Sequence, residues 1–307
     1  MLYTSSRTEP VTALANSLSK YLPKRFQKNY TTIPVVRLSG AIMAGGSALR
    51  PSLNLASCAG LLEKAFSFKG APAVALVVNS PGGSPVQSRL IYQRIRDLAK
   101  EKDKKVHVFV EDAAASGGYM IACAGDDITA DPSSIVGSIG VISSSFGFVD
   151  AIEKVGVTRR VYTAGQNKSV LDPFMPERAE DIDRLKSLQL DIHQVFIDLV
   201  KESRGERLAD NDDLFTGLFW TGGPAKELGL IDGLGDLRGT MKERYGKDTR
   251  LRLVERRQGL FGRRSGFGLD AGAISLNSLV VGEAASAATE RALTIAEEKT
   301  LWARLGL

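Results

Sequence analysis

Cysteine and histidine are scarce in this chain of 307 residues, which contains two of each. Cys58 and Cys123 cannot form a disulfide framework, and we expect both to fill core space in a reducing compartment. Two cysteines and two histidines so far apart along the sequence also predict no zinc site. If the protein is an enzyme, we expect it to need no metal and no cofactor.

Long hydrophobic runs are also missing. No stretch approaches 18 consecutive apolar residues, and the N-terminal segment lacks the apolar core of a secretory signal. We therefore expect a cytoplasmic protein. Its 43% hydrophobic residues still suffice for a large core, in a length compatible with one domain or two.

The net charge of +5 is unevenly distributed. Residues 1–30 carry a net +4 and residues 250–264 a net +5, so the remainder of the chain is acidic. Basic segments of this kind are most often solvated tails, and the alternative is a peripheral contact with the anionic inner face of a membrane. No pattern of stacking aromatic side chains accompanies them, so we do not expect nucleic acid as a partner.

Strand-like and helix-like patterns alternate along the chain, which predicts an α/β fold with βαβ crossovers. The strand-like runs span residues 35–38, 74–78, 106–110, 128–130, 140–142 and 159–162. A long helix is predicted from Glu177 to Ser203, and core packing or an oligomer contact would explain its apolar face. That face comprises Ile182, Leu185, Leu188, Ile192, Val195, Phe196 and Leu199.

One serine stands out as a candidate nucleophile. Ser116 follows the strand-like run VHVFV in an uncharged alanine and glycine segment, and Gly117 and Gly118 directly after it leave their amides uncovered. A helix starting here would aim free N–H donors at whatever the hydroxyl attacks. The alternative is a small-residue helix packed tightly against a sheet.

A nucleophilic serine needs a base, and neither histidine is well placed for that role. His107 lies inside a core-like strand and His193 within an amphipathic helix pattern, so we expect both to be structural or on the surface. Lys168 is a better candidate, since it is an isolated cation in a Gly/Asn-rich stretch. Its pKa would have to fall from about 10.4 to near 7, which costs roughly 4 to 5 kcal/mol through burial without a carboxylate partner.

Four motifs together resemble the signal peptide peptidase A family of serine-lysine peptidases, which includes the shorter SohB-like proteins. They are NSPGGS at 79–84, ASGGYMIA at 115–122, GSIGVI at 137–142 and the lysine segment at 165–173. Lys168 follows Ser116 by 52 residues, close to the spacing in single-domain members. The resemblance extends from about residue 33 to 252.

The resemblance implies a role for each site residue. Ser116 would be the nucleophile, Lys168 the general base, and the amides of Gly83 and Gly117 the oxyanion hole. Ser138 would hydrogen-bond the lysine amine, with the capping of a turn as its alternative role. The resemblance also implies the Clp-protease and crotonase-like spiral of ββα units, and a ring-like homo-oligomer.

The expected organisation is a single catalytic domain between tails. It comprises a basic N-terminal tail at 1–32, the peptidase domain at 33–255, a Gly/Arg-rich flexible segment at 256–282 and a C-terminal helix at 283–307. The expected function is a serine endopeptidase that forms an acyl-enzyme and cleaves extended peptides, such as signal-peptide remnants or small and apolar segments of unfolded proteins. The alternatives are a crotonase-like acyl-CoA enzyme and a non-catalytic scaffold at the membrane surface.

Overall fold

The computed structural model describes residues 30–45, 52–165, 167–255, 296 and 298–307. The predicted flexible segment at 256–282 lies outside the described residues, as do nearly all of the N-terminal tail and the first part of the predicted C-terminal helix.

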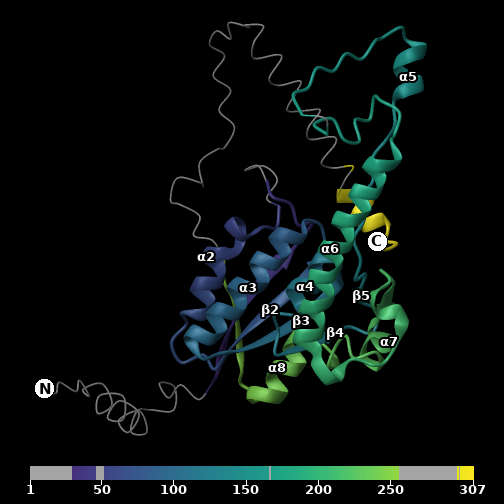
Figure 1. The fold of residues 1–307 in the computed structure, drawn as a ribbon. Helices are drawn as coiled ribbons and strands as arrows, with labels where there is room; N and C mark the ends of the chain where they lie inside the picture. The colour runs from purple at the N-terminus through teal and green to yellow at the C-terminus, as the bar shows by residue number, and fades with distance from the viewer. Residues whose placement is uncertain (1–29, 46–51, 166, 256–295, 297) are drawn as a thin grey trace, which may run out of the picture.

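A central sheet organises the described residues (Figure 1). Its main path runs in the order β6-β5-β3-β2-β1-β8; β4 branches from β3, and β7 pairs with β4. All pairs are parallel except β5 with β6. The strands are β1 (Thr32–Ser39), β2 (Ala73–Ser80), β3 (Lys105–Ala115), β4 (Asp127–Ala130), β5 (Ile135–Gly137), β6 (Phe219–Thr221), β7 (Gly233–Leu234) and β8 (Arg250–Leu253).

The long strand β3 pairs with two different strands along its length. Its residues 107–110 pair with β4, and residues 113–115 pair with β5. The sheet therefore divides at Glu111 and Asp112, and β5 runs beside the last residues before Ser116. This is the Clp-protease and crotonase-like α/β architecture.

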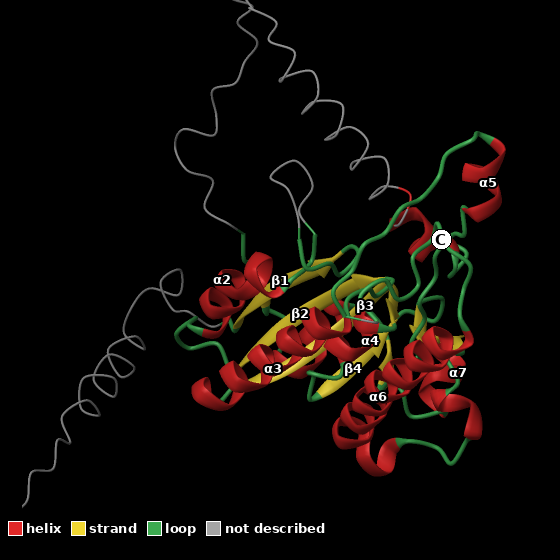
Figure 2. Cartoon of the chain, turned by 45° about the horizontal axis from the view of Figure 1, so that its top comes forward, coloured by secondary structure: helices red, strands yellow, loops and turns green. Residues whose placement is uncertain are grey.

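Helices cover both faces of the sheet unequally (Figure 2). On one face, α2 (Leu55–Phe66), α3 (Pro85–Lys102), α4 (Gly117–Ala122) and α6 (Ala179–Arg204) pack over the larger core cluster. On the other, α8 (Leu237–Tyr245) covers a smaller cluster through Met241. The remaining helices are α5 (Val149–Lys154), α7 (Gly222–Glu227), η2 (Gly205–Arg207) and η3 (Asp212–Phe215).

The start of α3 follows directly from its sequence. Ser84 is the N-cap, its hydroxyl accepts from the amide of Gln87 at 3.4 Å, and Pro85 occupies the first helical position. Proline fits there because the missing N–H would have no partner inside the helix. The NSPGGS motif therefore forms the turn from β2 into α3.

Two predicted strands are wrong. Residues 140–142 are not a strand, because the strand β5 lies earlier and the chain turns at Gly137 and Ser138, whose φ angles are 112° and 54°. Residues 159–162 lie in the segment 141–178, which projects from the body of the molecule and offers no neighbouring strand to pair with (Figure 1).

The long helix is confirmed as α6, but its predicted core face is only partly buried. Phe196 and Leu199 pack in the core, whereas Leu188, Ile192 and Val195 are 39–47% exposed. The exposed half extends beyond the sheet (Figure 1), and among the described residues no layer covers it. In the part of the chain that the structure describes, the apolar stripe is thus half core and half open surface.

Candidate functional site

Ser116 lies at the sharp turn between β3 and α4. Its backbone has φ 51° and ψ −121°, a region that costs a non-glycine residue roughly 1–3 kcal/mol. The turn is held from both sides: the Ser116 amide donates to Gly137 O at 2.8 Å, and its carbonyl accepts from the Tyr119 amide at 2.9 Å. Strain that neighbouring elements hold in place is typical of a residue positioned for chemistry.

Three glycines around Ser116 lie so close to other atoms of the protein that a side chain would not fit at their positions. A Cβ at Gly82 would lie 2.7 Å from the Ser116 Cβ, and Gly82 has φ 102°. A Cβ at Gly117 would lie 2.3 Å from the Ser88 hydroxyl, and one at Gly118 would lie 2.6 Å from the carbonyl of Ser80. The NSPGGS and ASGGY motifs therefore pack directly against each other.

Gly83 is held by a short backbone bridge to Ile42. The Ser84 amide donates to Ile42 O at 2.7 Å, and the Ile42 amide donates to Gly82 O at 2.8 Å. These bonds leave the amide of Gly83 itself without a hydrogen-bond partner among the described residues, and the same holds for the amide of Gly117. Both predicted oxyanion donors are therefore available to a ligand, although their role stays a prediction.

The helix that follows Ser116 is tied to the core at its far end. The Tyr119 hydroxyl donates to Leu230 O at 2.7 Å, and the Ser203 hydroxyl of α6 donates to Cys123 O at 2.6 Å. Burial raises the pKa of the Cys123 thiol to about 12 and also raises that of Tyr119 well above its usual value. Both groups stay protonated at neutral pH, so they act as packing and hydrogen-bonding groups.

A cavity of about 490 Å³ opens beside Ser116. Gly83 and Ser138 line it together with Ser116, so the structure brings three of the predicted site residues to one cavity. Its apolar wall includes Ile142 and Phe219. Further lining residues come from the described end of the C-terminal helix, Leu301, Arg304 and Leu305, and this part of the helix therefore packs on its own chain.

Lys168 is not among the residues that line the described cavities beside Ser116. It is exposed, in the projecting segment 141–178. Arg159 pairs with Asp172 at 3.0 Å in that segment, and the rings of Phe148 and Phe174 stack with centroids 5.5 Å apart. The segment thus has internal order of its own, and the predicted dyad stays a prediction.

The two histidines lie in different places. His107 is buried in β3 as predicted, and its ring nitrogens contact Asp127 at 2.7 Å and Tyr245 at 2.7 Å. His193 instead reaches a cavity of about 330 Å³ that Ser116 and Ser138 also line. Sequence reasoning missed this location, although His193 lies three residues before the core residue Phe196 and seven before Val200, on the same side of the helix.

Comparison with known proteins now decides the family. Residues 98–247 match the model of Peptidase family S49, and this range includes Ser116, Ser138 and Lys168. The chain belongs to peptidase family S49. Gly83 lies before the matched range, so its assignment depends on the geometry described above.

Three proteins similar to this S49 chain are named as proteases, and another is named as an antiporter. It is 32% identical over 212 residues to serine protease SPPA, chloroplastic, of Arabidopsis thaliana, covering 67% of this chain and 31% of that protein. It is 33% identical over 208 residues to protease 4 of Salmonella typhi, covering 67% of this chain and 33% of that protein. A solved structure of a membrane-bound stomatin-specific protease aligns with a TM-score of 0.45 at 17% identity, over 74% of this chain and 99% of that one.

A higher identity, 61% over 296 residues, links the chain to a Brucella abortus protein named Na(+)/H(+) antiporter NhaA. The alignment covers 96% of this chain but 40% of that protein. The name therefore describes a protein of which more than half lies outside the alignment. In the part of this chain that the structure describes, no helix has the length and apolar character needed to cross a membrane.

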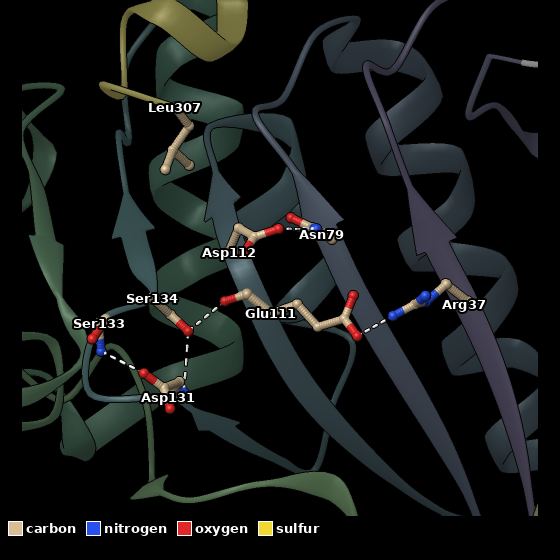
Figure 3. A pocket seen from close by; sticks show the side chains of 8 residues that line it. All are labelled: Arg37, Asn79, Glu111, Asp112, Asp131, Ser133, Ser134 and Leu307. Atoms are coloured by element: carbon tan, nitrogen blue, oxygen red, sulfur yellow. Dashed lines mark hydrogen bonds and ion pairs between the residues drawn. The ribbon is translucent and has the colours of Figure 1, made fainter.

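A second hollow of about 700 Å³ lies on the sheet face that α8 leaves open (Figure 3). Its polar groups satisfy one another: Arg37 pairs with Glu111, and Asn79 donates to Asp112 at 2.6 Å. The Ser134 hydroxyl donates to the carbonyl of Glu111. The lining of this hollow does not include a residue on a strained turn beside free backbone amides, so the candidate active site of this S49 chain is the Ser116 cavity.

Proposed function

We propose that the protein is a serine peptidase in which Ser116 attacks a peptide carbonyl and Lys168 acts as the general base. The observation that carries the proposal is the strained turn of Ser116 beside two free backbone amides. Family membership supports a peptidase over the crotonase-like acyl-CoA enzyme that has the same fold type. The chain spans less than half the length of the three curated relatives compared above, so its activity and substrates are proposals.

The proposed chemistry passes through an acyl-enzyme. Neutral Lys168 takes the proton of the Ser116 hydroxyl as the oxygen adds to the carbonyl, and later returns it to the leaving amine. The amides of Gly83 and Gly117 donate to the oxyanion, and water then hydrolyses the ester. Removing one such donor typically costs about 10² to 10³ in kcat.

We further propose that Lys168 reaches Ser116 of a neighbouring copy. In support, the lysine is exposed on a projecting segment, whereas a lysine that acts as a general base needs a desolvated amine. The same segment exposes large apolar side chains, with Phe146 78%, Val155 72% and Tyr162 91% exposed. A second copy packed on this segment and on the open half of α6 would cover them and desolvate the amine. This is the proposed form of the ring-like homo-oligomer.

The proposed substrate is an extended peptide with small or apolar residues near the scissile bond. The cavity wall at Ile142 and Phe219 supports apolar contacts, and the free amide of Gly83 at the same cavity supports a peptide carbonyl as the group bound. A cytoplasmic location, with peripheral contact to an anionic membrane as the alternative, remains part of the proposal.

Mixing two inactive variants tests the dyad and the shared site together. Ser116→Ala and Lys168→Ala should each lose hydrolysis of casein and of apolar fluorogenic peptides, while retaining fold and assembly. If neighbouring copies share the site, co-refolded variants should recover part of the activity. No recovery would overturn the shared site, and full activity of Lys168→Ala would overturn the base.

A further inference from the structure

His193 brings a polar side chain to the serine site from a separate element of the fold. It lies on α6, and it lines a cavity of about 330 Å³ together with Ser116, Ser138 and Thr216. Its Nε2 lies 3.0 Å from the carbonyl oxygen of Ile139. None of the roles assigned above to the site residues involves this histidine.

The partner of Nε2 determines the proton position on the ring. A carbonyl oxygen can only accept, so Nε2 must carry a hydrogen and donate it. In the neutral ring the lone pair is then on Nδ1, and Nε2 cannot take a proton from a serine. His193 is therefore bound as a donor and is not arranged as the general base through Nε2.

The carbonyl that accepts this bond belongs to the turn that holds Ser116. Gly137 O accepts from the Ser116 amide at 2.8 Å, and the Ser138 amide donates to Leu218 O at 2.7 Å. Ile139 is fully buried, and Ser138 has an unfavourable φ of 54°. His193 donates a side-chain hydrogen bond to Ile139, the next residue of this turn, and so links α6 to the wall of the serine cavity.

We propose that His193 is a positioning residue for peptide hydrolysis, which holds the turn at 137–140 and through it the orientation of Ser116 and Ser138. This inference depends on the proposed function, because the reaction it supports is the one at Ser116. The role is distinct from folding, since a misplacement of about 1 Å at the reacting groups can cost about 10²-fold in rate.

Matched variants at neighbouring positions of α6 test the role in catalysis. His193→Leu removes the donor and should lower kcat about 3- to 10-fold with little change in KM, the loss expected for one neutral hydrogen bond. His193→Gln places an amide donor near the position of Nε2 and should restore most of that loss. Gln194→Leu is the control, because Gln194 is exposed and its side chain donates along the helix to Asp198.

Two kinetic outcomes would overturn the proposal. Equal kcat in wild type and His193→Leu would show that the bond does not position the site. Loss of activity in His193→Gln as complete as in Ser116→Ala would instead identify the histidine as the proton acceptor.

A spectroscopic measurement tests the bond independently of activity. The chain has two histidines, so a long-range ¹⁵N–¹H correlation spectrum of histidine-labelled protein resolves both rings, and His193→Leu assigns them. We expect the neutral Nε2–H tautomer for His193, in wild type and in Ser116→Ala. The Nδ1–H tautomer would overturn the proposal. An inactive wild type with the expected tautomer would instead overturn the proposed peptidase function and, with it, the positioning role.

Discussion

The amide of Ser116 donates a 2.8 Å hydrogen bond to the carbonyl of Gly137, and this bond joins the serine turn to the end of β5. The two residues come together because β3 pairs with β5 only over its last three residues, up to the pair of Ala115 with Gly137. The orientation of the serine therefore depends on the register of this short pairing. Substitutions that disturb the turns next to it should lower activity far more than they lower stability.

Gly82→Ala tests this dependence most directly. The new Cβ would lie 2.7 Å from the Ser116 Cβ at a φ that disfavours side chains, so the serine must move. We expect a loss of about 10² in kcat/KM with a stability cost of roughly 1–3 kcal/mol, measured by peptide hydrolysis and thermal unfolding.

The matched control for this variant is Gly60→Ala in α2, where a Cβ meets no atom within 4 Å. It should stabilise the protein by about 0.5–1 kcal/mol and leave activity unchanged. Wild-type activity in Gly82→Ala would show that Ser116 tolerates displacement.

The ion pair of Arg204 with Asp232 predicts a pH-dependent part of the stability. Arg204 is fully buried, and its two terminal nitrogens bind the two Asp232 oxygens at 2.9 and 3.0 Å. Burial raises the pKa of Asp232, but the hydrogen bonds from Arg204 outweigh it, and the net pKa is lowered. Asp232→Asn leaves a buried guanidinium unpaired, which should cost roughly 3–5 kcal/mol at pH 7.

The sign of the pH dependence follows from the lowered pKa. The carboxylate contributes its full stability above its unfolded pKa of about 3.9 and loses it as the pH falls through the lower folded pKa. Denaturant unfolding from pH 7 to pH 2 should therefore show the gap between wild type and Asp232→Asn closing in acid. The exposed Asp248→Asn is the control and should follow the wild-type curve. A gap that stays constant would contradict the assignment.

The thiols should be unreactive in the folded protein. Cys58 and Cys123 are each 2% exposed, and burial raises the pKa of Cys123 to about 12, so almost no thiolate forms at pH 8. A disulfide reagent such as DTNB should label neither thiol in the native protein and both after unfolding. Ser144→Cys adds an exposed thiol and should react at once. Rapid labelling of the native wild type would show that α2, which contains Cys58, or the end of α4 at Cys123 opens.

The described end of the C-terminal helix should limit access to Ser116. Leu301 and Leu305 line the serine cavity, so Leu305→Glu should weaken the contact and raise kcat/KM about 2- to 5-fold for a peptide substrate. The neighbouring Ala303→Glu carries the same charge on an exposed position and is the control. An unchanged kcat/KM in Leu305→Glu would show that substrate enters from another side.

Much of the sheet could be predicted because its strands are buried on both faces. Continuous apolar runs mark β1, β2 and the first half of β3. The glycine pairs that follow β2 and β3 mark the places where two backbones approach closely. The 140–142 and 159–162 strands were predicted wrongly, since a short apolar run becomes a strand only when a partner strand lies beside it. Likewise, the sequence predicts which residues form the apolar face of α6, but not which half of that face is buried.

The sequence by itself determined the serine turn, since a serine before two glycines and after a buried strand has few conformations that satisfy both neighbours. It also determined the α/β class, through local patterns of apolar residues and turn residues. Only the tertiary structure decided that His193 lies at the serine cavity and that Lys168 lies on a projecting, exposed segment. The position of His193 depends on a contact with Ile139, 54 residues earlier, and that of Lys168 on how a whole segment leaves the body of the fold. Spacing along a chain specifies neither.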